Sequence, residues 1–211
     1  MHHLSRIRLL FLRGTPGTLA VALFLANSQH GNAAETEFEP LATGMEWIMD
    51  LQFISKDGTK TNGIFHRKIG ETAELNGKTY FRSHTWLEEG KPFAMDYTKL
   101  VRKDSEGYYS IDERDPKRFE KRSVKFPFEV GKSWEVKTDS GSTNRTSVIA
   151  KEDVTIGTNV YPNCFRLRII SLSGNYHEEF LEAPGVGAIK SEIKPGDGSE
   201  WLLTLKEFKK P

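Results

Sequence analysis

The sequence contains a single cysteine, Cys164, among its 211 residues. One thiol cannot close an internal disulfide, so a disulfide-stapled scaffold is excluded and the fold must be held together by packing. A nucleophilic cysteine needs a histidine beside it, and none lies near Cys164 along the chain. We interpret Cys164 as a semi-buried structural thiol that lies outward of its neighbour Phe165.

The chain also lacks an excess of charge of either sign. Its 30 basic and 29 acidic residues give a formal net charge of +1, which argues against a bulk electrostatic attraction to nucleic acid. The basic residues between Lys117 and Lys125 are mixed with an acid and a single aromatic residue, unlike the aromatic-rich basic groove of a single-strand binder. No nucleic-acid partner is predicted.

Long apolar runs are missing as well. The run Leu19–Ala26 has eight residues, whereas a membrane-spanning helix needs about 20. Three arginines precede this run and small residues follow it, an order typical of a secretory signal peptide. We therefore predict that residues 1–34 are a signal peptide that is removed and that residues 35–211 form a single β-domain. The product is expected to be periplasmic or secreted, with no membrane span after the signal is removed.

No stretch of the chain has a convincing helical period, whereas strand-like alternation is frequent. The clearest case is Met45–Ile54, in which one side carries Met45, Trp47, Met49, Leu51 and Phe53. A period of two over this length predicts a strand with one buried face. The preceding residues, Glu35–Gly44, are expected to be a loose lead-in.

Turn signals separate further short strands from there to the C-terminus. Asn76-Gly77 supplies the positive φ values of a tight hairpin. Strands are expected over Ile64–Ile69 and Thr72–Leu75, and the charged stretch 113–125 is expected to be an exposed strand or a connection. Regular spacing of this kind predicts an all-β fold of about 10–11 antiparallel strands in one strongly curved sheet or open barrel, with a sandwich as the alternative.

A glycine-rich corner divides the stretch Phe180–Ile193. Pro184 and Gly185 end its first part, and Gly187 follows after one valine. Glycines at this spacing allow a positive φ or a close approach of another backbone. We therefore predict a structural corner at Pro184, Gly185 and Gly187.

The sequence contains no convincing motif for catalysis or metal binding. The histidines of the predicted mature chain, His66, His84 and His177, lack the short spacing of a convergent pair of zinc ligands. Ser191 and Lys194 match an S-x-x-K pattern, but that chemistry needs a helix and the segment is expected to be a strand. No catalytic residue, metal site or cofactor is predicted.

Aromatic residues are the strongest remaining feature, and all four tryptophans follow the predicted signal peptide. In one interpretation the aromatic residues fill the core. In the other, some of them line a concave apolar pocket, as a carrier of a hydrophobic ligand requires. The residues predicted to bind such a ligand are Trp47, Met49, Phe53, Trp86, Trp134 and Trp201.

Two segments carry a resemblance to known proteins. Residues 127–134 read P-x-x-V-G-K-x-W, and residues 183–190 read A-P-G-V-G-x-x-K. Both segments resemble a group of uncharacterised exported bacterial β-proteins, which look like distant relatives of the periplasmic lipoprotein-carrier fold. The resemblance implies a curved antiparallel sheet with an apolar concave face, and it supplies no catalytic residues.

The leading hypothesis is a non-enzymatic exported β-domain that binds an apolar ligand or a protein partner in the cell envelope. The alternatives are a small secreted hydrolase whose site assembles only in space, and a purely structural envelope component. The first predicts a cavity lined by aromatic residues without titratable groups. The second predicts a cleft that holds a histidine or carboxylate of strongly perturbed pKa, and the third predicts no pocket beyond small voids.

Overall fold

The computed structural model describes residues 38–88, 95–114, 119–138 and 141–211. The predicted signal peptide, residues 1–34, lies outside these ranges. Within them the chain forms strands and turns and no helix. The strands are β1 (Glu46–Ile54), β2 (Lys60–Leu75), β3 (Lys78–Leu87), β4 (Asp96–Asp104), β5 (Gly107–Asp112), β6 (Lys121–Lys125), β7 (Ser133–Lys137), β8 (Thr143–Ile156), β9 (Asn159–Ser171), β10 (Tyr176–Ala183), β11 (Gly187–Pro195) and β12 (Glu200–Lys209).

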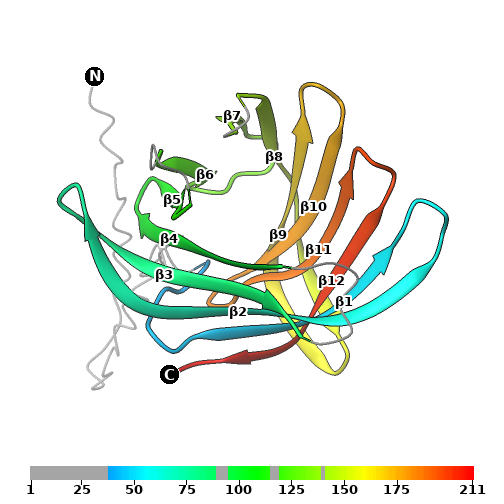
Figure 1. Ribbon diagram of the computed structural model, residues 1–211, viewed down its shortest axis with the longest axis horizontal. Helices are drawn as coiled ribbons and strands as arrows, with labels where there is room; N and C mark the ends of the chain where they lie inside the picture. Colours follow the sequence, from blue (N-terminus) through cyan, green and yellow to red (C-terminus); the bar gives the residue numbers. More distant parts are fainter. Residues whose placement is uncertain (1–37, 89–94, 115–118, 139–140) are drawn as a thin grey trace, which may run out of the picture. The chain divides into compact units, whose positions relative to one another are not determined.

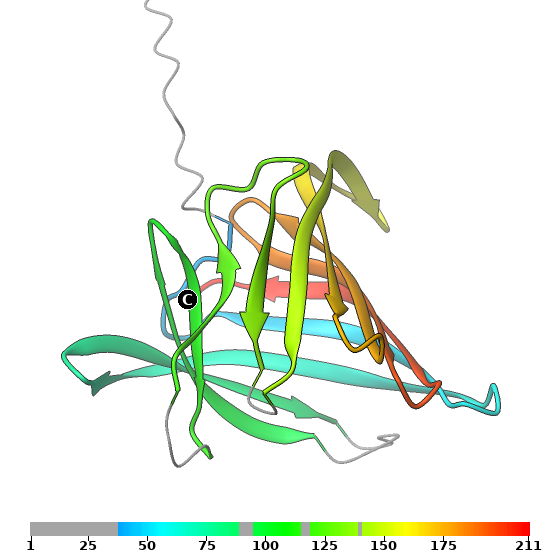
Figure 2. The ribbon, with the colours of Figure 1, turned by 90° about the horizontal axis from the view of Figure 1, so that it is seen from above.

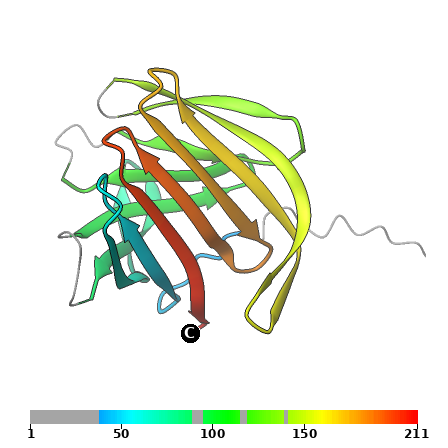
Figure 3. The ribbon, with the colours of Figure 1, turned by 90° about the vertical axis from the view of Figure 1, so that its right-hand side faces the viewer.

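All twelve strands form one antiparallel sheet, in the order β6-β5-β4-β3-β2-β1-β12-β11-β10-β9-β8-β7. Strands adjacent in sequence pair with each other, except β6 and β7, which are the two edges of the sheet, and a single long-range pair places β1 beside β12 (Figure 3). The sheet curls until β6 and β7 approach each other, which gives a nearly closed, barrel-like sheet (Figures 1 and 2). The prediction of an all-β fold with one strongly curved antiparallel sheet is confirmed.

The number of strands and one boundary differ from the prediction. β2 is a single strand of 16 residues and not the two strands predicted over Ile64–Ile69 and Thr72–Leu75. A bulge between Ile69 and Thr72 shifts the register without ending the strand. β6 forms within the charged stretch 113–125, where an exposed strand was one of the two expectations, and it is partly exposed. The described residues contain twelve strands, against about ten or eleven predicted.

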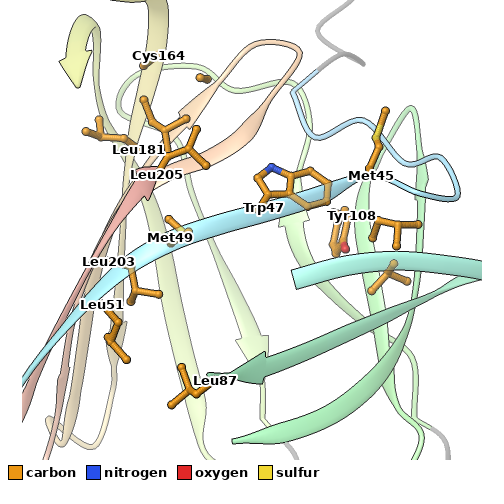
Figure 4. Close-up of a cluster of buried hydrophobic side chains, with 14 residues drawn as sticks. Met45, Trp47, Met49, Leu51, Leu87, Tyr108, Cys164, Leu181, Leu203 and Leu205 are labelled. Atoms are coloured by element: carbon orange, nitrogen blue, oxygen red, sulfur yellow. The ribbon is translucent and has the colours of Figure 1, made fainter. Parts of the chain in front are cut away.

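The odd-numbered residues of β1, and Met45 directly before it, face the inside of the curve. Four of these residues are at most 8% exposed, as the alternation predicted: Met45, Trp47, Met49 and Leu51. Phe53 at the end of the strand is only partly buried. The buried side chains continue the cluster across the neighbouring strand β12 through Leu203 and Leu205 (Figure 4). The core of the domain thus lies on the concave face of the sheet.

Residues 38–44, which we call the inner strap, pack against this concave side. Phe38 is 6% exposed and packs edge-on against Phe128 and Phe165, with ring centroids 5.0 Å and 5.3 Å away. The backbone carbonyl of Glu39 accepts a hydrogen bond from Lys103 Nζ on β4 at 2.9 Å. The expectation of a loose lead-in is therefore wrong for this part. Its apolar and charged contacts come from strands distant in sequence, which local pattern does not reveal.

The predicted corner touches both the core and the inner strap. Gly185 and Gly187 have φ values of 71° and 94°, in the region that favours glycine. A side chain at Gly187 would place its Cβ 3.0 Å from Glu39 Cγ. Between the two glycines, the carbonyl of Val186 accepts a hydrogen bond from Trp47 Nε1 at 2.7 Å. The corner therefore holds the inner strap and the central tryptophan of β1.

Cys164 is more deeply buried than predicted. Its side chain is fully shielded, and its thiol donates to the carbonyl of Tyr161 at 3.2 Å. Burial raises the pKa of this thiol to about 11. The expectation of a semi-buried thiol assumed strict alternation along the strand, but the register between β8 and β9 shifts twice near this point. At neutral pH Cys164 is a protonated core residue.

Candidate functional site

A cavity of about 230 Å³ lies inside the curve of the sheet. The lining residues come from β1, β2, β10, β11 and β12 and, at another side, from β4 and the residue before it. Because β4 and β10 are far apart in the strand order, a cavity that both strands line must lie within the curl. Most of its wall is apolar and includes Trp47, Met49, Leu51, Phe65, Trp201 and Leu203.

A larger hollow of about 700 Å³ lies over Asp50, Gln52, Asn62 and Thr204. These residues alternate with the inward-facing residues of their strands, so the hollow is on the convex side. Asp50 and Asn62 are exposed to solvent. We regard the inner cavity as the candidate site because it combines apolar walls with shielding from water.

Four polar side chains also line the inner cavity: Arg67, Tyr97, Glu178 and Ser191. Ser191 Oγ donates to Glu178 Oε1 at 3.0 Å, and Tyr176 Oη donates to Glu178 Oε2 at 2.6 Å. Burial raises the pKa of Glu178, although both hydroxyl groups stabilise its ionised form. The expectation of a cavity without titratable groups is therefore wrong.

Arg67 connects the cavity to the inner strap. Its Nη2 donates to Glu39 Oε1 at 2.5 Å and to Tyr108 Oη at 2.6 Å, and its Nε donates to Ser83 Oγ at 2.9 Å. The guanidinium carbon lies 4.9 Å from the centroid of the Trp47 ring, within the range of a cation–π contact. Arg67 is thus held by an ion pair, two hydroxyl groups and an aromatic face.

A second carboxyl group lies close to this network. Glu182 on β10 is 5% exposed, and its Oε2 has no hydrogen-bond partner among the described residues. The pKa of Glu182 is raised to about 8, chiefly by burial and also by the neighbouring charge of Glu39, while Arg67 opposes the shift. Near neutral pH the protonated form of Glu182 therefore predominates.

We expect Glu182 to make the stability of the domain depend on pH. Its pKa is about 8 in the folded chain and about 4.3 in an unfolded one, so the folded state binds this proton more tightly. The stabilisation is complete below about pH 4.3 and is lost as the pH rises through about 8. Glu182→Gln should abolish this loss, and in urea unfolding at about pH 9 it should be more stable than the wild type by roughly 2–4 kcal/mol.

The matched control for this measurement is Glu179→Gln, on the outer side of the same strand. Glu179 pairs with Arg168 at 2.7 Å in a solvent-accessible position, so its replacement should change stability by less than about 1 kcal/mol. Equal pH dependence in the wild type and in Glu182→Gln would show that Glu182 is ionised without cost.

The structure brings together part of the set predicted to bind a ligand. Trp47, Met49 and Trp201 line the cavity. Phe53 lies next to them, edge-on to Trp201 with ring centroids 6.3 Å apart. Whether these residues bind a ligand stays a prediction.

The other two predicted residues lie elsewhere. Trp86 is stacked between His66 and His84, with ring centroids 4.7 Å and 4.9 Å away, and its strand neighbours Thr85 and Leu87 are the buried ones. Trp134 on β7 packs against a separate cluster that contains Phe126. The polar lining residues were not predicted from the sequence, because a charged residue within a strand normally indicates an exposed face.

The described residues contain no group of histidine, cysteine and acidic side chains arranged to hold a metal ion. Nor do they contain a helix long and apolar enough to cross a membrane.

Comparison with known proteins reveals similarity at the level of the fold. The sequence matches no protein-family model and no curated protein. A solved structure from Bacteroides fragilis, provisionally described as an exported protein with a YmcC-like fold, is similar with a TM-score of 0.51 and 11% identity, covering 83% of this chain and 100% of that one. A provisionally described lipoprotein from Parabacteroides distasonis has a TM-score of 0.47 and 10% identity, covering 82% and 99%.

Proposed function

We propose that this chain is an exported β-domain that binds an apolar ligand in the cavity inside its curved sheet. The observation that carries the proposal is the cavity itself, which has apolar walls and a few polar groups held in place by hydrogen bonds. This combination is typical of small-molecule sites, in which apolar area supplies affinity and a few polar groups fix the orientation.

The size of the cavity limits the ligand. At about 230 Å³ it is smaller than the roughly 300–1,000 Å³ of most ligand pockets. It suits a single acyl chain or a small aromatic molecule better than a whole phospholipid. Met49 and Met95 in the lining are unbranched and adapt to varied apolar shapes.

An exported location, periplasmic or secreted, fits this function. It is supported by the signal-like N-terminus and by the provisional description of the Bacteroides fragilis protein as exported. The resemblance to the lipoprotein-carrier fold agrees with it, since a curved sheet with an apolar concave face is the arrangement such a carrier needs. Fold alone does not determine function, so binding must be measured.

Filling the cavity should abolish binding. Ala188 on β11 lines the cavity, and Ala188→Met would extend a flexible apolar chain into it. We expect affinity for the neutral fluorescent probe N-phenylnaphthylamine to fall at least about tenfold, while stability changes by less than about 1.5 kcal/mol because the space accepts the added atoms. Val160→Met, at a site that is 64% exposed, is the matched control and should bind the probe as the wild type does. If Ala188→Met binds the probe with the same affinity as the wild type, the probe binds outside the cavity.

A hydrolase is the second candidate, because the hydrogen-bonded pair Ser191 and Glu178 lies in the cavity and the carboxyl group has a raised pKa. Against it, Glu178 also accepts from Tyr176, and no histidine is among the lining residues. The test is hydrolysis of p-nitrophenyl decanoate. We expect no rate above that of buffer; hydrolysis that is lost in both Ser191→Ala and Glu178→Gln would favour the hydrolase.

A further inference from the structure

Three basic side chains lie in or next to the cavity, and they bear on the charge of the ligand. Arg67 lines the cavity, Lys99 Nζ lies 5.1 Å from the ring centroid of the lining residue Tyr97, and Lys103 Nζ binds the inner strap. The pKa of Glu182 is raised to about 8, so this acid is mainly protonated near neutral pH. Burial also raises the pKa of Glu178, while Lys99 opposes that shift.

Two further acids of the described residues already have cationic partners. Glu39 is paired with Arg67. Asp112, opposite Lys99 across the strand pair, is held by Arg114 through both of its carboxylate oxygens. Basic side chains therefore lie next to the apolar wall of the cavity, and among the described residues Glu182, which is mainly protonated, does not offset their charge.

Arg67 has further N–H groups that could bind a ligand. A guanidinium group carries five N–H donors, and those of Arg67 bind Ser83, Glu39 and Tyr108 through Nε and Nη2. Within the described residues, Nη1 makes no hydrogen bond. A planar guanidinium with free donors is well suited to a carboxylate or another anionic oxygen group.

We infer that the ligand is an anionic amphiphile whose chain fills the apolar wall and whose carboxylate or similar head binds Arg67. The inference rests on the proposed function, since it assumes that the cavity binds a ligand at all. Glu39 then competes with the ligand head for the same cation, so the inner strap controls affinity.

The inference is tested by calorimetric titration with three molecules that share one chain, decanoate, decanol and decylamine, at neutral pH. The wild type should bind decanoate at least about tenfold more tightly than decanol, and decylamine more weakly than decanol. Glu39→Gln removes the competing charge, so it should tighten decanoate about tenfold and leave decanol unchanged. Glu129→Gln, at an exposed position outside the cavity, is the control and should change neither.

A double variant tests Arg67 without leaving the partly buried carboxylate of Glu39 unpaired. Arg67→Met with Glu39→Gln should bind decanoate and decanol alike. Equal binding of decanoate and decanol by the wild type, tightest binding of decylamine, or retained preference for decanoate in the double variant would each overturn the inference while the proposed function stands. If neither these molecules nor N-phenylnaphthylamine bind, the proposed function itself fails.

Discussion

Replacement of Arg67 by methionine is expected to lower the free energy of unfolding by about 3–5 kcal/mol. The variant keeps most of the apolar volume but leaves Glu39 without its ion-pair partner and removes the hydrogen bond that Tyr108 accepts from Arg67. It also removes the positive charge that offsets the pKa rise of Glu182. The cost therefore comes mainly from acids left uncompensated inside the curl, and urea unfolding at neutral pH measures it.

Two comparisons separate this explanation from a simple packing defect. Adding Glu39→Gln to Arg67→Met removes the stranded charge and should restore at least about half of the lost stability. Arg168→Met breaks an ion pair with Glu179 at a position where the arginine side chain is 44% exposed and should cost less than about 1 kcal/mol. If Arg67→Met alone lowers the free energy of unfolding as little as Arg168→Met does, the ion pair of Arg67 and Glu39 contributes little to stability.

Truncation of Trp47 to alanine is expected to cost about 3–5 kcal/mol. Trp47 is 3% exposed, its ring stacks on Phe208 with centroids 5.1 Å apart, and its Nε1 satisfies the carbonyl of Val186. The variant loses apolar contacts and also leaves that carbonyl without its donor. Thermal and urea unfolding check the prediction.

The matched control is Trp86→Ala, which removes the same side chain from the opposite face of the sheet. Because the Trp86 ring stacks on His66 and His84, we expect this variant to lose about 1–2 kcal/mol of stability, less than the loss at Trp47. Equal costs would mean that the concave face is not the main core. Because Trp47 is both packed and in contact with the cavity, it does not distinguish a core residue from a ligand residue; Ala188 does.

The elements governed by local pattern could be predicted from sequence. Alternation along Met45–Phe53 predicted both the strand and its buried side, and repeated turn signals predicted the antiparallel all-β fold. The glycines of the corner were identified for the same reason, since their conformational requirement is local. These features depend on neighbouring residues alone.

Features that depend on distant contacts could not be predicted. The pairing of β1 with β12 and the curl that brings β4 opposite β10 decide which side chains share a cavity. Arg67 is partly buried and Glu182 is buried against the usual preference of charged residues for water, because each finds partners or a proton inside the curl. Bulges add a further limit, as they shifted the register at β2 and around Cys164.

The most direct test of a ligand-binding cavity is methionine methyl NMR during titration with decanoate. The chain contains three methionines after the predicted signal peptide, Met45, Met49 and Met95. Met49 and Met95 line the cavity, whereas Met45 is buried in the adjoining core outside the lining. We expect saturable shifts of the Met49 and Met95 methyl signals, little change at Met45, and no shifts in Ala188→Met. Signals that do not move, or that move equally at all three methionines and persist in Ala188→Met, would contradict this expectation.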